Sequence, residues 1–449
     1  MRCIQRLLAC LLCLILGCSA ACAEEKAYIG YQDAHRFTLD WQETKRPNGS
    51  LVKLWQIETA NASVTQELNA LAQGFADAMA PSLKAPKSGV SRLTVSIRPS
   101  RTGLSWMSFM VQARSVYEER TADVAFTTRT YDMLTGAPVT LNDLFPADSE
   151  AWPMLESALR EGVNAYWEGT EPDADALAAA CTRDAIAQMD FTLHGMSLVL
   201  HLNAADFYPG KAQLIEVTLF YPALYPYMTE RALTETNNAA YYKTVTLTYD
   251  DGPNGWCSNQ ILDVLLRTGA RATYFLVGER VKQQAYIVQR EHDEGHAVAS
   301  HNYQHVYANS TAASVLKPMP AKVDAVTREA IGIPVRYARA PGGQWEGMAA
   351  AELGWPLIQW SVQAEDWRGE DGPDPKQTAG NIAVGADDGG IILMHDLKRN
   401  SIQASEMFIT RMQEDGYLFL TVDELFAKDG VVLQPDTPYW RCTDGVTTN

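Results

Sequence analysis

Residues 244–253 read Thr-Val-Thr-Leu-Thr-Tyr-Asp-Asp-Gly-Pro, a β-type run that ends in two aspartates and a turn. Six more β-type runs follow along the chain, and helical segments separate them. The seven runs are Thr244–Tyr249, Ala272–Val277, His296–Ser300, Val335–Arg339, Pro356–Val362, Gly390–Met394 and Tyr417–Thr421. Alternating strands and helices predict a parallel sheet, so the expected fold class is α/β, and seven units are typical of a barrel or a distorted barrel.

Reactive side chains follow five of these predicted strands at the point where each strand ends. They are Asp250 and Asp251 after the first, His301 and His305 after the third, Arg339 at the end of the fourth, Asp366 and Trp367 after the fifth, and His395 and Asp396 at the end of the sixth. Loops at the carboxyl ends of barrel strands meet at one mouth. The sequence therefore predicts that these side chains converge on a single opening.

Two His-x-x-x-His pairs occur in the chain, and they are interpreted differently. His292 and His296 lie on either side of Gly295, which is expected to end a helix, so this pair is interpreted as structural. His301 and His305 follow a strand, where a separation of four residues places both rings on one face. Two neutral imidazoles and one carboxylate leave a divalent ion open positions for water and substrate, which is typical of a catalytic zinc site.

The adjacent aspartates are not expected to be equivalent. Neighbouring side chains point in different directions, so one carboxylate can bind an ion while the other acts as a base. Asp250-Asp251-Gly252-Pro253 alone is typical of a plain polar turn. The other segments at the same predicted mouth favour the catalytic interpretation.

Five ordered motifs resemble those of the polysaccharide deacetylase family, also called the NodB homology or carbohydrate esterase 4 family. They are Thr248–Pro253, His301–His305, Arg339–Gly343, Asp366-Trp367 and Leu393–Asp396, within a match that covers about residues 243–427. The resemblance implies a distorted (β/α) barrel and metal-dependent removal of acetyl groups from a glycan.

The resemblance also implies a role for each matched residue. Metal ligands would be Asp251, His301 and His305; the general base would be Asp250, held by Arg339; the general acid would be His395, tuned by Asp366; Trp367 would line the sugar groove, and the Gly342 N–H would serve an oxyanion. Zn²⁺ is the first choice of ion, with Co²⁺ and Mn²⁺ as alternatives.

Three positions depart from the family pattern. Asn302 replaces a Ser or Thr that braces the loop, although an amide can still form hydrogen bonds. Gln363 stands where a further acid is usual, which removes one negative charge near the site. Gly342 stands where many relatives have Tyr.

The front half, from about residue 27 to 229, has no repeating unit, which predicts a smaller α+β domain with an antiparallel sheet. The expected elements are a helix over Asn61–Met79 and strands over Arg92–Ile97, Trp106–Tyr117, Val124–Tyr131, Phe191–Leu202 and Leu214–Tyr221. His194 and His201 are isolated in strands and are interpreted as structural. Residues 128–145 resemble a small extracytoplasmic domain of lysozyme-binding anti-sigma factors and of some secreted deacetylases, which implies a wall-facing or binding role.

The N-terminus has the pattern of a targeting segment. Arg2 and Arg6 precede an uncharged stretch over residues 7–23, which ends in Ala-Cys-Ala and predicts a cleaved secretion signal. A sequence similar to a bacterial lipoprotein box ends at Cys18, so a lipid anchor there and a free secreted form both stay open. The predicted organisation is a signal peptide over 1–23, an accessory domain over 24–228, a polar linker over 229–242 and a deacetylase domain with a tail over 243–449.

Charge and cysteine content limit the partners and the means of stabilisation. The chain has 37 Lys and Arg against 54 Asp and Glu, a net charge of −17, which argues against a nucleic-acid partner. Only Cys181, Cys257 and Cys442 follow the signal, and a Cys257–Cys442 bridge and three free thiols both stay open.

The function expected from the sequence is N-deacetylation of an N-acetylated glycan, with bacterial peptidoglycan as the first choice, by a secreted or surface-bound enzyme. One alternative is a wall-binding or sensing protein whose deacetylase domain is weakened, which Gln363 and the front domain motivate. Another alternative is an O-deacetylase acting on xylan, which differs only in the leaving group. The sequence predicts neither the oligomeric state nor which sugar loses its acetyl group.

Overall fold

A computed structural model describes residues 28–30, 32–87, 89–368 and 372–442. The predicted signal peptide and the candidate lipidation site at Cys18 lie outside these residues. Within the described part of the chain, no helix combines the length and the apolar character needed to cross a membrane.

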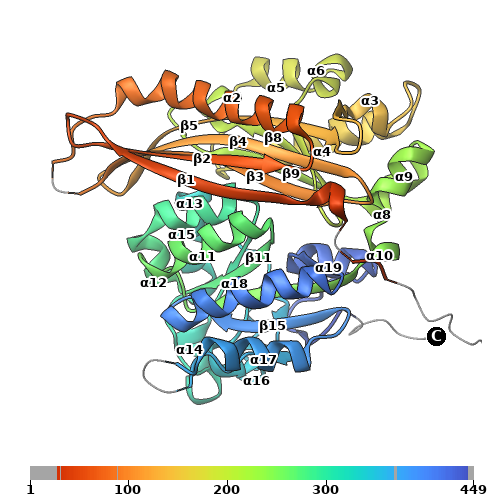
Figure 1. The fold of residues 1–449 in the computed structure, drawn as a ribbon. Coiled ribbons are helices and arrows are strands. Elements are labelled where there is room, and N and C mark those ends of the chain that lie inside the picture. The colour runs from red at the N-terminus through yellow and green to blue at the C-terminus, as the bar shows by residue number, and fades with distance from the viewer. Residues whose placement is uncertain (1–27, 31, 88, 369–371, 443–449) are drawn as a thin grey trace, which may run out of the picture.

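The front half contains a long twisted sheet that is covered on one face by a helix (Figure 1). Its strands, in spatial order, are β1 (Phe37–Lys45), β2 (Leu51–Thr59), β3 (Ser91–Thr102), β4 (Trp106–Tyr117), β5 (Arg120–Asp132) and β6 (Ala137–Pro138). Neighbouring strands are antiparallel except for the parallel pair β2 and β3. The helix is α2 (Ala62–Met79), which begins where the Asn61 side chain accepts two backbone N–H groups. The α+β class and the predicted helix over 61–79 are therefore confirmed.

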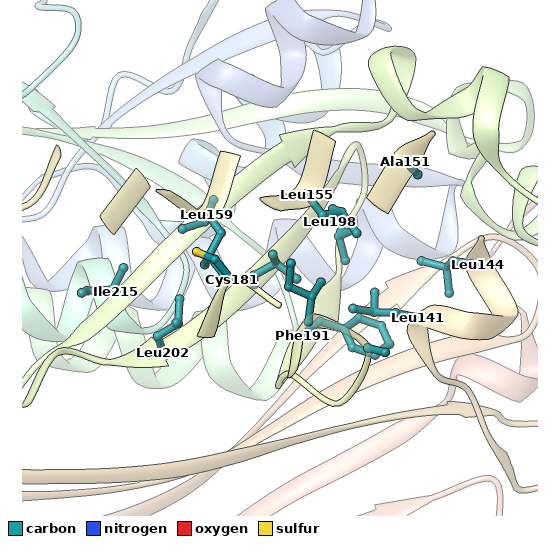
Figure 2. Packing of buried hydrophobic residues seen from close by; sticks show 14 of the residues in the cluster. Leu141, Leu144, Ala151, Leu155, Leu159, Cys181, Phe191, Leu198, Leu202 and Ile215 are labelled. Atoms are coloured by element: carbon teal, nitrogen blue, oxygen red, sulfur yellow. The ribbon is translucent and has the colours of Figure 1, made fainter. Parts of the chain in front are cut away.

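A second, smaller sheet completes the front half. It contains β7 (Phe191–Leu193), β8 (Ser197–Asn203) and β9 (Leu214–Phe220), all antiparallel. The strand predicted over 191–202 is therefore two strands, because the chain reverses at Gly195, where His194 N–H donates to the Ser197 carbonyl. Helices pack apolar residues on this sheet (Figure 2); they are α3 (Leu141–Leu144), α4 (Ala151–Ala165), α5 (Ala174–Ala180), α6 (Arg183–Ala187), α7 (Ala204–Phe207) and α8 (Tyr221–Leu224).

The C-terminal half is built on a parallel sheet, as predicted. Its spatial order is β12 (Ala297–Ser300), β11 (Ala272–Leu276), β10 (Lys243–Asp250), β15 (Gly390–His395) and β14 (Val362–Gln363), and β16 (Tyr417–Leu420) also pairs with β10. The surrounding helices include α11 (Cys257–Thr268), α12 (Gly278–Gln283), α13 (Ala285–Asp293), α15 (Met319–Ile331), α16 (Trp345–Ala350), α17 (Pro375–Gly385), α18 (Arg399–Glu414) and α19 (Val422–Lys428).

Two of the seven predicted strands are less regular than expected. The segment 335–339 forms only isolated bridges, from Ala338 to Ser300 and to Leu357. The segment 356–362 splits into β13 (Leu357–Ile358) and β14, and β13 pairs with the short β17 (Pro438–Tyr439). The α/β architecture is confirmed, and these short contacts on one side distort the barrel.

Residues 229–242, predicted as a polar linker, form the short helices α9 (Glu230–Thr236) and α10 (Asn238–Tyr241) instead. Glu235 of α9 and Asn238 of α10 are fully buried polar side chains that bind the turn between β3 and β4. The carboxylate of Glu235 accepts two backbone N–H groups of that turn at 2.8 and 2.9 Å, and the amide oxygen of Asn238 accepts a third at 2.7 Å. The polar composition reflects these buried contacts, not an open connection.

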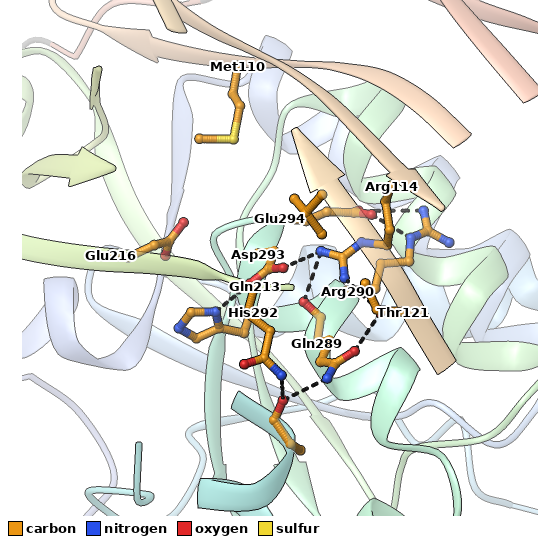
Figure 3. A network of polar contacts seen from close by, with 12 residues as sticks. Met110, Arg114, Thr121, Gln213, Glu216, Gln289, Arg290, His292, Asp293 and Glu294 are labelled. Atoms are coloured by element: carbon orange, nitrogen blue, oxygen red, sulfur yellow. Dashed lines mark hydrogen bonds and ion pairs between the residues drawn. The ribbon is translucent and has the colours of Figure 1, made fainter. Parts of the chain in front are cut away.

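The two halves meet across a buried polar network (Figure 3). Arg114 of β4 forms an ion pair with Asp293 at the end of α13, and Asp293 also binds the ring of His292 at 2.8 Å. His292 is 6% exposed and His296 is 7% exposed, and His296 accepts the backbone N–H of Ala272 through Nδ1. These contacts confirm that the His292 and His296 pair is structural.

The three remaining cysteines are free thiols in this structure. Cys257 begins α11, whereas Cys442 lies against Gly389 before β15. The Cys257–Cys442 bridge that the sequence left open is therefore not formed.

We predict that Glu235→Gln lowers the free energy of unfolding by about 2 kcal/mol, because a buried charged acceptor is replaced by an amide whose N–H₂ faces backbone donors. The measurement is urea denaturation. Glu230→Gln is the control, since Glu230 is exposed on the same helix and its loss should cost less than about 0.5 kcal/mol. Equal effects of the two substitutions would contradict the buried role of residues 229–242.

Candidate metal centre and active site

The carboxyl ends of three strands of the parallel sheet, β10, β12 and β15, carry the candidate site. Asp250 ends β10 and His395 ends β15, and the parallel register places these two residues side by side. Asp251 directly follows β10 with a left-handed φ of 78°, and His301 directly follows β12. Because these strands are parallel and belong to one sheet, residues far apart in the sequence meet at one edge.

Asp251, His301 and His305 form a group with the donor set of a divalent metal site. The Asp251 Oδ1 atom lies 3.3 Å from His301 Nε2 and 3.2 Å from His305 Nε2, and the three ligand atoms lie within 4.8 Å of one another. His301 Nδ1 donates to the Arg339 carbonyl at 3.0 Å, which leaves the Nε2 lone pair for the centre. Asp251 Oδ1 is buried without a hydrogen-bond partner. A cation would satisfy that oxygen, so the residues present fit a metal ion.

The protonation of these groups follows from their contacts. Burial opposes ionisation of Asp251, but the close contacts with the imidazoles of His301 and His305 outweigh it and hold the pKa of the carboxyl well below its usual range. The close contact with Asp251 raises the pKa of His305. Asp251 is therefore ionised, and a metal ion would compete with protons for the imidazoles.

Asp250 has entirely different surroundings from Asp251. It is 3% exposed, and its Oδ1 atom accepts from Arg339 at 2.8 Å. Arg339 is fully buried and also donates to the Thr248 hydroxyl and to two backbone carbonyls, at 2.6, 3.0 and 2.9 Å. The predicted inequivalence of the two aspartates is therefore present in the geometry.

His395 is held by Asp366 on the other side of the site. Its Nδ1 lies 2.9 Å from Asp366 Oδ1, and its backbone N–H donates to Asp366 Oδ2 at 2.8 Å. Burial alone lowers the pKa of His395, but the hydrogen bond and charge of Asp366 outweigh it and raise this pKa to about 9. His395 is therefore protonated at neutral pH and can donate a proton.

Sequence reasoning missed two residues of α18 that hold Asp366. Ser401 Oγ donates to Asp366 Oδ2 at 2.6 Å, and the Asn400 amide donates to the Asp366 carbonyl at 3.1 Å. Gln363 is exposed and forms no hydrogen bond or ion pair with the His395–Asp366 pair among the described residues. Asp366 is therefore oriented by Ser401 and Asn400 of α18 in addition to His395.

Gly342 and Tyr307 lie against each other beside the ligands. Gly342 has a left-handed φ of 62°, and a Cβ there would lie 2.8 Å from the Tyr307 ring. Tyr307 is 51% exposed, and its ring centroid is 5.8 Å from that of His305. Tyr307, which sequence reasoning missed, thus fills the space that a side chain at 342 would need. In the sequence, only its position two residues after His305 indicated that Tyr307 would lie at the site.

The remaining predicted residues also lie in the loops of the site. Trp367 directly follows Asp366 and is 47% exposed. Asn302 is fully buried, and its side-chain oxygen accepts the Tyr303 N–H at 3.0 Å while its own N–H donates to the Ser300 hydroxyl at 3.0 Å. The amide at 302 therefore braces the loop, as the sequence analysis expected. Among the described residues, no group accepts the Gly342 N–H.

A carboxylate and two imidazoles, with a second carboxylate and a protonated imidazole beside them, are the groups that a metal-dependent hydrolase requires. Residues 237–355 match the family described as "Polysaccharide deacetylase". The chain belongs to the polysaccharide deacetylase family through this domain.

Several named proteins are similar to the chain. Peptidoglycan-N-acetylglucosamine deacetylase PgdA of Listeria monocytogenes is 28% identical over 323 residues, which cover 70% of this chain and 66% of that protein. Peptidoglycan-N-acetylmuramic acid deacetylase PdaA of Bacillus subtilis is 29% identical over 41% of this chain and 71% of that protein. A solved structure titled "T48 deacetylase with substrate" is 32% identical, covers 44% of this chain and 96% of that one, and has a TM-score of 0.41.

The extent of the Listeria match has a consequence for the front half. Only 207 residues follow residue 242 (449 minus 242), so a match over 323 residues extends into the front half. The chain spans just under two thirds of that relative's length.

We predict that His305→Gln lowers the affinity for Zn²⁺ by about 100-fold or more, because one of three ligands is lost while the half-exposed position tolerates the change. Isothermal titration calorimetry measures it. Tyr307→Phe is the control, since it keeps the neighbouring ring and removes only a hydroxyl. An unchanged affinity of His305→Gln would show that the ion binds elsewhere.

Proposed function

We propose that this protein is a metal-dependent hydrolase that removes the acetyl group from the nitrogen of an N-acetylated bacterial wall glycan, with peptidoglycan as its substrate. The observation that carries the proposal is the pairing of a buried carboxylate, Asp250, with a protonated His395 in adjacent register around the three-ligand group. An amide needs both an activated water and a proton for its nitrogen, and this pair supplies both.

The residues divide the reaction between them. Asp251, His301 and His305 would hold a divalent cation, which when bound supplies Lewis acidity to the acetyl carbonyl and to water. Asp250 accepts the proton of the attacking water, and Arg339 holds its carboxylate in place.

A second proton, separate from the one that Asp250 accepts, is then supplied to the leaving nitrogen. The Gly342 N–H is available to the oxygen on which negative charge builds. His395 delivers its proton to the nitrogen as the C–N bond breaks, and the neutral imidazole stays bound to Asp366. The products are acetate and a free amino sugar.

The finer assignments rest on chemistry and on the relatives. Two imidazoles and one carboxylate suit Zn²⁺ first, with Co²⁺ and Mn²⁺ as alternatives. The names of the Listeria and Bacillus relatives support peptidoglycan as the substrate. We propose a secreted or surface-bound location from the pattern over residues 1–23, with Cys18 as the site of an optional lipid anchor.

A second candidate function is O-deacetylation of xylan. It is favoured by the similarity to a bifunctional xylanase/deacetylase of Pseudobutyrivibrio xylanivorans, 33% identical over 205 residues that cover 45% of this chain and 33% of that protein. The sugar oxygen of an ester can leave without the proton that the nitrogen of an amide requires. His395 would therefore matter less for this substrate. Acetate release from peptidoglycan fragments, chitooligosaccharides and acetylated xylan, with and without a chelator, separates the two functions.

We predict that Asp250→Asn lowers kcat by about 1,000-fold on N-acetylated substrate while Zn²⁺ affinity stays within about threefold, because the substitution removes the base and leaves the three ligands. Acetate release and calorimetry measure the two quantities. Unchanged kcat in Asp250→Asn would contradict the role of Asp250 as the base. A loss of Zn²⁺ affinity together with kcat would show that Asp250 is a metal ligand.

We predict that kcat/KM falls as pH rises through the pKa of His395, since only the protonated ring donates. With that pKa raised to about 9, activity persists through neutral pH and is lost on the alkaline side. Asp366→Asn should move this limb to lower pH by about one unit or more, because it removes the hydrogen bond and charge that hold the proton. A bound cation lowers the pKa of His395 in the variant and in the wild type alike. The quantity to measure is therefore the difference in pH between the alkaline limbs of the two proteins. An alkaline limb that does not move in Asp366→Asn would show that Asp366 does not set the pKa of His395.

A further inference from the structure

A stacked aromatic and basic pair at the rim of the site has no part in the roles above. Trp256 lies in the loop that follows β10 and is 49% exposed. The exposed Arg399 begins α18, four residues after His395, and its guanidinium lies 4.7 Å from the centroid of the Trp256 ring. We call these two side chains the Trp256–Arg399 stack.

Hydrogen bonds fix the loop of Trp256 against the segment that follows β15. The side-chain oxygen of Asn254 accepts the Trp256 N–H at 3.1 Å, and the Asn254 N–H donates to the Ser258 hydroxyl at 2.7 Å. Ser258 in turn donates to the buried carboxylate of Asp396, the residue after His395. The Trp256–Arg399 stack is therefore linked through Ser258 and Asp396 to the carboxyl end of β15, the strand that ends in His395.

The charge of Arg399 is not explained by the stability of the protein. A cation at the N-terminus of a helix opposes the helix dipole, and α18 has 16 residues. Among the described residues no carboxylate pairs with Arg399, although the chain has 54 acidic residues. By contrast, Arg411 on the same helix pairs with Asp415 at 3.0 Å, and Arg368, which lies over Trp367, pairs with Glu365 at 2.7 Å.

We propose that the Trp256–Arg399 stack is a substrate subsite for a sugar that carries a carboxylate, next to the sugar that loses its acetyl group. The open part of the indole packs on the apolar face of a sugar ring, and the outward N–H groups of the guanidinium bind the carboxylate. The inference rests on the proposed function and narrows its substrate to an anionic wall glycan in preference to neutral chitin or xylan.

A wall glycan offers such a carboxylate from two sources. One is the lactyl group of N-acetylmuramic acid when no peptide is attached, and the other is the peptide stem when it is. Three probes separate them: a neutral N-acetylglucosamine pentamer, a peptide-free glucosamine–muramic acid oligomer, and the same oligomer with its peptide stems. Both Kd, with the chelated protein, and kcat/KM, with the zinc-loaded protein, are measured for each.

Arg399→Gln should reduce the preference for carboxylated over neutral oligomers by about tenfold in Kd, because one charge-assisted contact is lost. Arg411→Gln removes the same charge from the same helix and should leave that preference unchanged. Trp256→Ala should weaken binding of all three probes. The oligomer that loses more affinity in Arg399→Gln identifies the source of the carboxylate. The melting temperature of Arg399→Gln should not fall, since the helix dipole favours removal of this cation.

The two proposals fail separately. An equal loss for neutral and carboxylated probes, or no loss in Arg399→Gln, overturns the subsite. No acetate release from any probe, with the carboxylate preference in Kd intact and sensitive to residue 399, overturns the deacetylase function and keeps the subsite.

Discussion

The ion pair between Arg339 and Asp250 is the interaction on which the site depends. Asp250 is almost fully buried and Arg339 is fully buried. Water therefore cannot replace the four acceptors of the Arg339 guanidinium. Removing one partner of a buried pair leaves an uncompensated charge, which costs about 3–5 kcal/mol. The same arginine supplies the carbonyl that orients His301, so the proposed base and one of the proposed metal ligands are positioned by one residue. Their relative geometry is thus fixed before any substrate binds.

The packing of the two halves leaves the site accessible to solvent while the strands that carry it stay rigid. Arg114, Lys53 and Arg98 of the front sheet bind acids and carbonyls around α11 and α13, at the amino ends of the parallel strands (Figures 1 and 3). The carboxyl ends carry the reactive residues and face away from this interface. The front half therefore covers the end of the barrel that carries none of the candidate site residues. It stabilises the strands at their amino ends.

The sequence predicted the site better than it predicted the front half, and the reason is the range of the interactions. Asp250, Asp251 and His395 follow strands of buried apolar residues, so local pattern alone places them at one edge. The strand β1 was missed because most of its side chains are exposed and give no alternation. Glu235 was missed because its burial depends on a turn 130 residues away, a pairing that no local window contains.

Tyr307 shows how one loop can complete another. A glycine at 342 leaves a gap beside the ligands, and the φ of 62° there is one that a larger residue adopts only with strain. The ring of Tyr307 enters from the loop that carries His305 and fills this gap, so the wall of the site is continuous although residue 342 has no side chain. Because the ring is half exposed and lies beside His305, the wall is formed by a side chain that also faces solvent. The shape of the site at this point is therefore set by two loops together, and a substitution in either one changes what the other can hold.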